Sequence, residues 1–212
     1  LAWMLRVTIS WQLILLSTVV IAAIGSLLFD KLSGSTFDQF TELYLAVTDQ
    51  AVGQDMSSLS PAEADERFAN MRSLLVGFFA MGQGFAMFAF LALARWWQSL
   101  LYNPGGFQQE MHQLRLVPLV AVGVLSLVLL CLALGALGFV RWVPLLMLPL
   151  VIAGVCVVHW LVKEKSLSGN WLVGFYVMLV FLAQVLYPML AFIALVDSWL
   201  DLRKRIRLDR EE

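Results

Sequence analysis

The stretch LVPLVAVGVLSLVLLCLALGALGFV, residues 116–140, is free of Asp, Glu, Lys and Arg. A helix needs about 20 apolar residues to cross about 30 Å of hydrocarbon, so this stretch is long enough to span a bilayer. Only Arg141 and Trp142 separate it from a second uncharged stretch, VPLLMLPLVIAGVCVVHWLV at 143–162. Two such neighbours predict a helical hairpin inside a membrane.

Five segments of this kind occur along the chain. They are Trp11–Phe29, Ser73–Ala94, Leu116–Val140, Val143–Val162 and Trp171–Leu200, and only the last contains a charge, Asp197. Indole rings prefer the headgroup level, and six tryptophans lie at segment ends: Trp96, Trp97, Trp142, Trp160, Trp171 and Trp199. The pattern predicts an all-α, polytopic transmembrane helix bundle of five to six crossings. Residues 1–212 form a single integral membrane domain in this prediction, with a charged tail at 201–212.

Composition supports a membrane protein and argues against other classes. The chain is 61% hydrophobic and 14% charged, whereas soluble domains are about 45–50% apolar and about 25% charged. Long apolar blocks are unlike the alternating strands of an outer-membrane barrel. The net charge of −1 gives no indication of a nucleic-acid partner. Cys131 and Cys156 sit in apolar blocks at depths that exclude a disulfide, so neither a disulfide nor a metal site is expected.

The start of the chain resembles the end of an apolar helix. Leu1–Leu5 is apolar and is followed by Arg6, with no basic region before it and no small-residue cleavage site after it. We therefore expect further transmembrane helices upstream, so that the chain is N-terminally truncated.

The segment 30–72 is the one sizeable polar insertion, and its pattern predicts two amphipathic helices. Thr36 and Gln39 form a possible capping box for the first helix, while Ser60, Pro61 and Glu63 form one for the second. Two interpretations remain open: a helical cap on the membrane surface, or a lid over a substrate cavity.

Charge placement gives a contradictory topology with five crossings. Lys and Arg near helix ends prefer the cytoplasmic side, which places the basic tail after Leu200 inside and the acidic 30–72 segment outside. Four crossings lie between them, so the two would share one side. Either the last segment is broken near Gln184 and Pro188 into two short helices, or the acidic segment is cytoplasmic. We favour the broken pair, with the protein in a bacterial cytoplasmic (inner) membrane and the tail in the cytoplasm.

Polar groups inside a membrane are costly and are the first candidates for function. The candidates for ligand binding are Gln83, Asn103, Tyr176, Gln184, Asp197 and Arg203. Asp197 is expected to form an ion pair or a helix-end anchor, and His159 to be a structural histidine. The sequence shows no catalytic motif, so we expect no enzyme activity, no catalytic residues and no cofactor.

Two stretches carry a family resemblance: RWWQSLLYNPGGFQQE at 95–110 and ALVDSWLDLRKR at 194–205. They resemble the YybS-like family of predicted bacterial multi-pass membrane proteins, a domain of unknown function. That family is grouped with a transporter superfamily that includes the substrate-binding subunits of energy-coupling-factor vitamin transporters. The resemblance implies a helical bundle that holds a small solute. The positions that match the family pattern are Asn103, Pro104, Gly105, Gly106, Asp197, Trp199 and Arg203.

Two functions follow as hypotheses. The first is a small-solute binding or transport subunit, with a cavity between the second and third crossings and the last pair. The alternative is a non-catalytic membrane scaffold that binds another membrane protein or a second copy of itself through its small-residue faces. The lipid bilayer is a partner in both.

Overall fold

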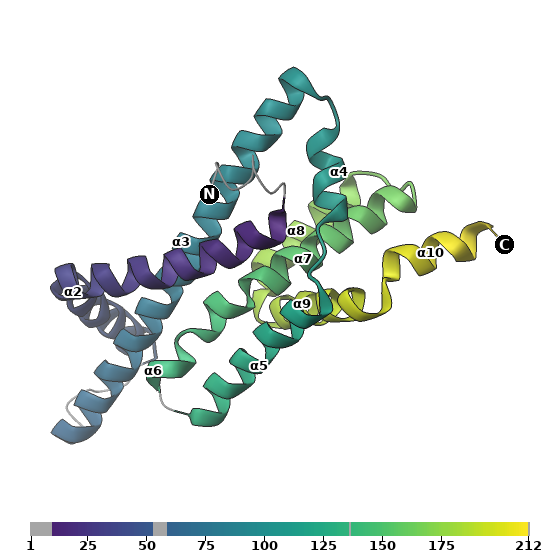
Figure 1. The fold of residues 1–212 in the computed structure, drawn as a ribbon. Coiled ribbons are helices and arrows are strands. Elements are labelled where there is room, and N and C mark those ends of the chain that lie inside the picture. The colour runs from purple at the N-terminus through teal and green to yellow at the C-terminus, as the bar shows by residue number, and fades with distance from the viewer. Residues whose placement is uncertain (1–9, 53–58, 136, 212) are drawn as a thin grey trace.

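The computed structural model describes residues 10–52, 59–135 and 137–211, and the described part of the chain is built from helices without strands. Figure 1 shows their arrangement as a bundle with a long arm. The helices are α2 (Trp11–Val52), α3 (Pro61–Tyr102), α4 (Gly106–Gln113), α5 (Pro118–Leu134), α6 (Leu137–Val140), α7 (Val143–Glu164), α8 (Asn170–Phe181), α9 (Ala183–Leu200) and α10 (Leu202–Glu211). The predicted start at Leu1–Leu5 lies outside the described residues.

Four of these helices are long and apolar enough to cross a membrane, and α4 with α5 adds a fifth if that bent pair is counted as one span. Many leucine, valine and phenylalanine side chains on their outer surfaces are exposed. Apolar side chains on the outside of a bundle are stable where lipid is the solvent. The all-α transmembrane bundle predicted from the sequence is therefore confirmed.

The arm is formed by α2 and α3, which are 42 residues each, or about 63 Å at 1.5 Å per residue. The predicted helix start at Thr36 is about three residues late: the non-helical backbone of Ser33 divides α2 into two helices, and the second one begins before Thr36. The predicted start at Ser60 is confirmed, because Ser60 and Glu63 form a reciprocal capping box.

The third predicted crossing ends earlier than expected. Pro118 occupies the first turn of α5, and Gly135 ends the helix in the left-handed conformation (φ +64). Glycine adopts this conformation without steric cost and so stops a helix that hydropathy alone would extend to Val140. The fourth predicted crossing is confirmed by α7.

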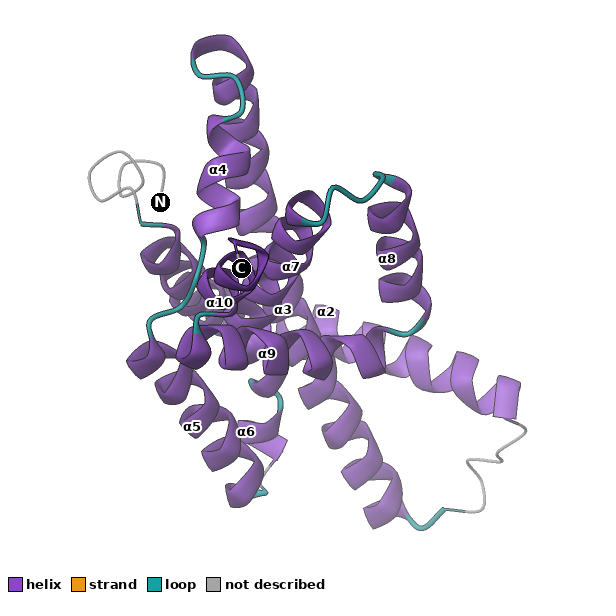
Figure 2. Cartoon of the chain, turned by 90° about the vertical axis from the view of Figure 1, so that its right-hand side faces the viewer, coloured by secondary structure: helices purple, strands orange, loops and turns teal. Residues whose placement is uncertain are grey.

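The last predicted crossing is broken, as expected from its length. The break falls at Leu182, two positions before Gln184, while Pro188 lies inside α9. The 12 residues of α8 extend only about 18 Å, too short to cross a bilayer. Figure 2 shows α8 standing at the edge of the bundle.

The helix at the centre of the bundle is α7, which packs against α2, α3, α5 and α9. Its Gly154 faces the backbone carbonyl of Leu190 so closely that an added Cβ would collide with it. Tyr187 donates a hydrogen bond to the Pro144 carbonyl at 2.9 Å. These two contacts align α9 beside α7, since small residues allow helix backbones to approach in a membrane.

Both ends of the α8–α9 pair lie at the same end of the molecule. Lys163, just before α8, donates to Gln108 of α4, and Ser198 at the end of α9 donates to the Leu116 carbonyl. The chain therefore enters the bundle from this end with α8 and returns to the same end with α9, so the pair does not cross the membrane. We call this the α4 end, comprising α4, residues 114–117, the end of α9, and α10. The far end comprises residues 34–52 and 61–72, on the opposite side of the bundle (Figure 1). The basic tail and the acidic insertion are thus on opposite sides.

Candidate functional site

The candidate site at the α4 end is built around a buried ion pair. Arg203 Nε lies 3.3 Å from Asp197 Oδ2, and the two side chains are 10% and 2% exposed. Asp201 makes this possible, because its left-handed backbone (φ +49) ends α9 and turns the chain so that Arg203 lies back over Asp197. The ion pair expected from the sequence for Asp197 is therefore present.

Arg203 also completes the end of α4. Its guanidinium donates to the backbone carbonyls of His112 and Leu114, the latter at 2.7 Å. The last carbonyls of a helix have no partner within the helix, and a buried one is costly unless a donor reaches it. One arginine thus joins the α9–α10 junction to the end of α4.

A second arginine fastens the next segment of chain. Arg115 donates to the Ser198 carbonyl at 2.8 Å and pairs with Asp201 Oδ2 at 2.7 Å. Ser198 Oγ in turn donates to the Leu116 carbonyl at 2.7 Å. The extended link between α4 and α5 is held against the end of α9 from both sides.

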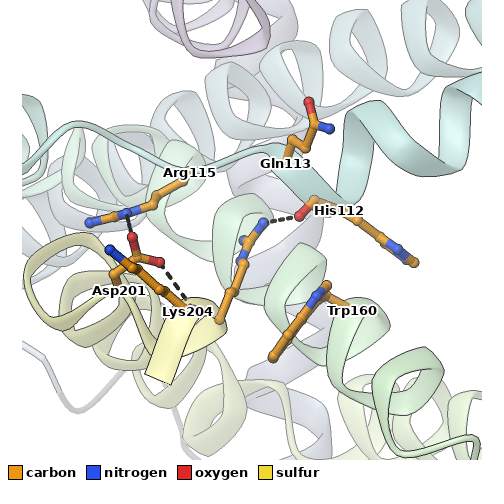
Figure 3. A pocket seen from close by; sticks show the side chains of 7 residues that line it. His112, Gln113, Arg115, Trp160, Asp201 and Lys204 are labelled. Carbon is orange, nitrogen blue, oxygen red and sulfur yellow. Dashed lines mark hydrogen bonds and ion pairs between the residues drawn. The ribbon is translucent and has the colours of Figure 1, made fainter. Parts of the chain in front are cut away.

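Beside these contacts lies an open cavity of about 430 Å³. Figure 3 shows how its lining side chains surround it. They come from α4, the link that follows it, α7 and the α9–α10 junction, and are His112, Gln113, Arg115, Trp160, Asp201, Arg203 and Lys204. An adjoining cavity of about 320 Å³ shares His112, Gln113 and Trp160 and adds Lys163 and Glu164.

The lining of the two cavities is predominantly cationic. Four cationic side chains, Arg115, Lys163, Arg203 and Lys204, line the cavities with two carboxylates, Asp201 and Glu164. A third carboxylate, Asp197, lies behind Arg203, so the excess is one positive charge. The side chains that the structure describes end at Ile206, and among them no carboxylate forms an ion pair with the exposed ammonium of Lys204. The two cavities therefore form a site that favours a small anion.

His112 contributes a neutral group to this site. Burial, together with the smaller effects of Lys163, His159 and Arg203, lowers the pKa of His112 to about 4. Its imidazole is uncharged at neutral pH and so offers one donor and one acceptor to a ligand. Within the described residues, no group of three or more His, Cys, Asp and Glu is placed to hold a metal ion.

Above the cavity, α4 is anchored to α2 and to α3. Glu110 pairs with Arg95 and accepts from the Trp11 indole at 3.0 Å. The turn before α4 has Gly105 in the left-handed conformation (φ +86), which glycine adopts without steric cost. These contacts fix the position of α4 over the end of the bundle.

The ligand-binding candidates named from the sequence lie at several separate places. Asp197 and Arg203 form the buried pair, and Arg203 lines the cavity. Asn103 is an exposed C-cap of α3, and Gln184 is exposed at the start of α9. Tyr176 hydrogen-bonds to His159 at 2.7 Å. Gln83 lies against Gly25 with its buried Oε1 unpartnered among the described residues.

Sequence reasoning did not select the other cavity residues. Arg115 and Lys204 were visible only as part of a general bias of basic residues toward helix ends. His112 and Trp160 belong to helices that are distant in sequence, and no spacing rule brings them together. Comparison of the chain with models of known families, with curated proteins and with solved structures gave no match.

Proposed function

We propose that this integral membrane protein binds a small anionic solute at its α4 end, as a binding or transport subunit. The observation that carries the proposal is the excess of cationic side chains around an open cavity, with Lys204 free to contact a ligand. Guanidinium and ammonium groups bind phosphate and carboxylate with short, charge-assisted hydrogen bonds.

We further propose that the α4 end faces the cytoplasm of a bacterial cell. Its basic residues stand close to helix ends, where the cytoplasmic preference of Lys and Arg is strongest. Because α8 and α9 leave and return on one side, this orientation places the acidic insertion outside without contradiction. Lys165→Cys and Gln50→Cys would report the two sides: an impermeant maleimide should label only the second in intact cells.

The binding proposal is tested by titrating the full chain in neutral detergent with inorganic phosphate at low salt. Lys204→Gln should weaken binding several-fold, because it removes an exposed ammonium that lines the cavity and is not held by a carboxylate among the described residues of 10–206. The matched control is Lys31→Gln, an exposed lysine of α2 remote from the α4 end, which should leave binding unchanged. Equal affinity of wild type and Lys204→Gln would refute the site.

A phospholipid headgroup presents the same phosphate chemistry, so a second measurement separates the sources. The protein is exchanged into phosphatidylglycerol nanodiscs and the retained lipid is counted by native mass spectrometry. Free phosphate that binds in the absence of lipid supports a solute. Retained phosphatidylglycerol without any binding of free phosphate would assign the cavity to a lipid headgroup and overturn the solute proposal.

A further inference from the structure

Toward the far end lies a third cavity, of opposite character to the two at the α4 end. It is an apolar groove of about 490 Å³ between α3 and the part of α2 around and beyond the Ser33 kink. We call residues 34–52 the distal half of α2. Its lining is aromatic and aliphatic apart from one threonine: Phe29, Thr36, Phe37, Phe40, Leu43, Tyr44, Val47, Leu75 and Phe79. Nothing in the cationic site accounts for this groove, which lies at the other side of the bundle.

The distal half of α2 meets α3 through a narrow buried strip. Phe37, Thr41 and Leu45 are buried along it, and Phe37 contacts Phe79 edge to face at 5.4 Å between ring centroids. The two flanks of this strip differ sharply in chemistry.

One flank is closed by ion pairs. Asp38 pairs with Arg72 at 2.6 Å, and Asp49 pairs with Arg67. Arg72 also pairs with Asp30 at 2.7 Å, so that it bridges the carboxylates before and after the non-helical Ser33. This bridge fixes the bend of α2 and so fixes how far the distal half stands from α3.

The other flank is open. Phe40, Leu43, Tyr44 and Val47 recur at spacings of three and four, which places them on one face of the helix. All four are exposed. At 3.6 residues per turn, Asp38, Glu42 and Asp49 fall on the opposite side, so the apolar face has no charged residue of its own helix beside it.

The groove continues directly from the surface that faces hydrocarbon. Phe29 belongs to the apolar part of α2, while Leu75 and Phe79 belong to that of α3. A chain of methylene groups lying against these residues could extend along Phe40 and Tyr44 without leaving apolar surroundings. A soluble partner would meet only the outer part of the groove, since its floor belongs to the spanning segments.

We propose that this groove seats one acyl chain of a membrane phospholipid, held between the distal half of α2 and α3. The ion pairs on the closed flank set the width of the groove, and the exposed aromatic side chains cover the chain from the water side. The occupant is recognised by its apolar chain, because the groove offers no charged partner to a headgroup.

The test uses the full chain in proteoliposomes that contain phosphatidylcholine with a photoreactive diazirine in one acyl chain. After illumination, peptide mass spectrometry should find labels on Phe40, Tyr44 and Leu75 and none on Asp38 or Glu42. Labels restricted to the spanning parts of α2 and α3 would overturn the proposal. Disulfide-linked dimers of a Phe40→Cys variant, formed under mild oxidation, would also overturn it, because a second copy would then occupy the groove.

A filling substitution adds a matched comparison. Thr36→Trp places an indole in the groove and should reduce labelling of residues 40–47 several-fold. Leu32→Trp, on the same helix but outside the groove and 84% exposed, should leave the labelling unchanged. Equal labelling in both variants contradicts the proposal. If Thr36→Trp fails to fold, the residue pattern in the wild type decides the question.

Discussion

At the α4 end, Arg203 and Asp197 are 10% and 2% exposed, whereas at the far end Arg72, Asp30 and Asp38 keep 26%, 19% and 46% of their side-chain surface accessible. Both ends use arginine–aspartate pairs, but the first pair has lost its water and the second has not. The desolvated pair is stable only because backbone carbonyls also accept from the same guanidinium. The hydrated pairs act as a clamp on a bent helix.

The two ends also differ in the kind of ligand that their cavities favour. At the α4 end, Lys163 and Lys204 line open cavities, have no carboxylate partner among the described residues of 10–206, and favour an anion. At the far end, the charges are used on one flank and leave the other flank entirely apolar. The same residue types therefore support a polar ligand in one place and a lipid in the other.

The largest expected effect comes from breaking the buried pair. Arg203→Met leaves the Asp197 carboxylate unpaired and removes the donor from the His112 and Leu114 carbonyls. Loss of one partner of a buried pair costs about 3–5 kcal/mol. The free energy of unfolding, measured by SDS titration from mixed micelles, should fall by about that amount. Lys204→Met at the exposed neighbouring position should change it by less than about 0.5 kcal/mol, and equal losses would contradict the contrast.

The next effect concerns backbone packing near the far end. A Cβ at Gly77 would collide with the backbone carbonyl of Arg141, whereas one at Gly82 would meet nothing within 4 Å. Gly77→Ala should therefore destabilise by about 1–3 kcal/mol through overpacking. Gly82→Ala on the same helix should be neutral or slightly stabilising, because alanine is the better helix former. The same SDS titration measures both variants, and similar stabilities would show that α3 and residue 141 are not in contact.

A smaller effect is expected from pH at the α4 end. The unfolded His112 takes up a proton near pH 6.5, whereas burial keeps the folded residue neutral until its pKa of about 4. The unfolded state therefore binds more protons between these values, and stability falls as pH falls from about 6.5 to about 4. Thermal unfolding across this range should be less pH-dependent in His112→Gln than in the wild type. An unchanged slope would show that His112 is hydrated.

The smallest effect is expected from the ion pairs of Arg72 at the far end. Arg72→Gln removes the ion pairs to Asp30 and Asp38, which are partly exposed, so the loss should not exceed about 1 kcal/mol. The loss should also shrink as salt is added, because exposed charges are screened. A loss as large as that of Arg203→Met, or one that salt leaves unchanged, would mean that the two ends do not differ as described.

Much of the fold could be read from local features. The apolar segments, the capping box at Ser60 and the turn at Gly105 each depend on a few consecutive residues, and the structure contains all three. The errors also have local causes. A helix began before Thr36, and Gly135 ended one early, because hydropathy says nothing about backbone conformation.

The candidate site was harder to predict, because its residues are joined only by packing. Arg203 reaches the carbonyl of Leu114, 89 positions earlier in the chain. Gln83, Tyr176 and Gln184 were candidates because they are polar residues inside predicted membrane crossings. They lie apart from the cationic cavity. Polarity inside a membrane marks a residue as costly, but it does not indicate which neighbour offsets the cost.

The amino-acid sequence alone determined that this chain forms apolar helices, roughly where they begin, and that the last one breaks. Hydropathy and helix capping are sums over adjacent residues, so they need no knowledge of the fold. Only the tertiary structure decided that α8 and α9 return to one side, that Arg203 closes the end of α4, and that the far end keeps an apolar flank open. Each of these depends on which distant surfaces meet, and that is settled by the packing of whole helices rather than by any local pattern.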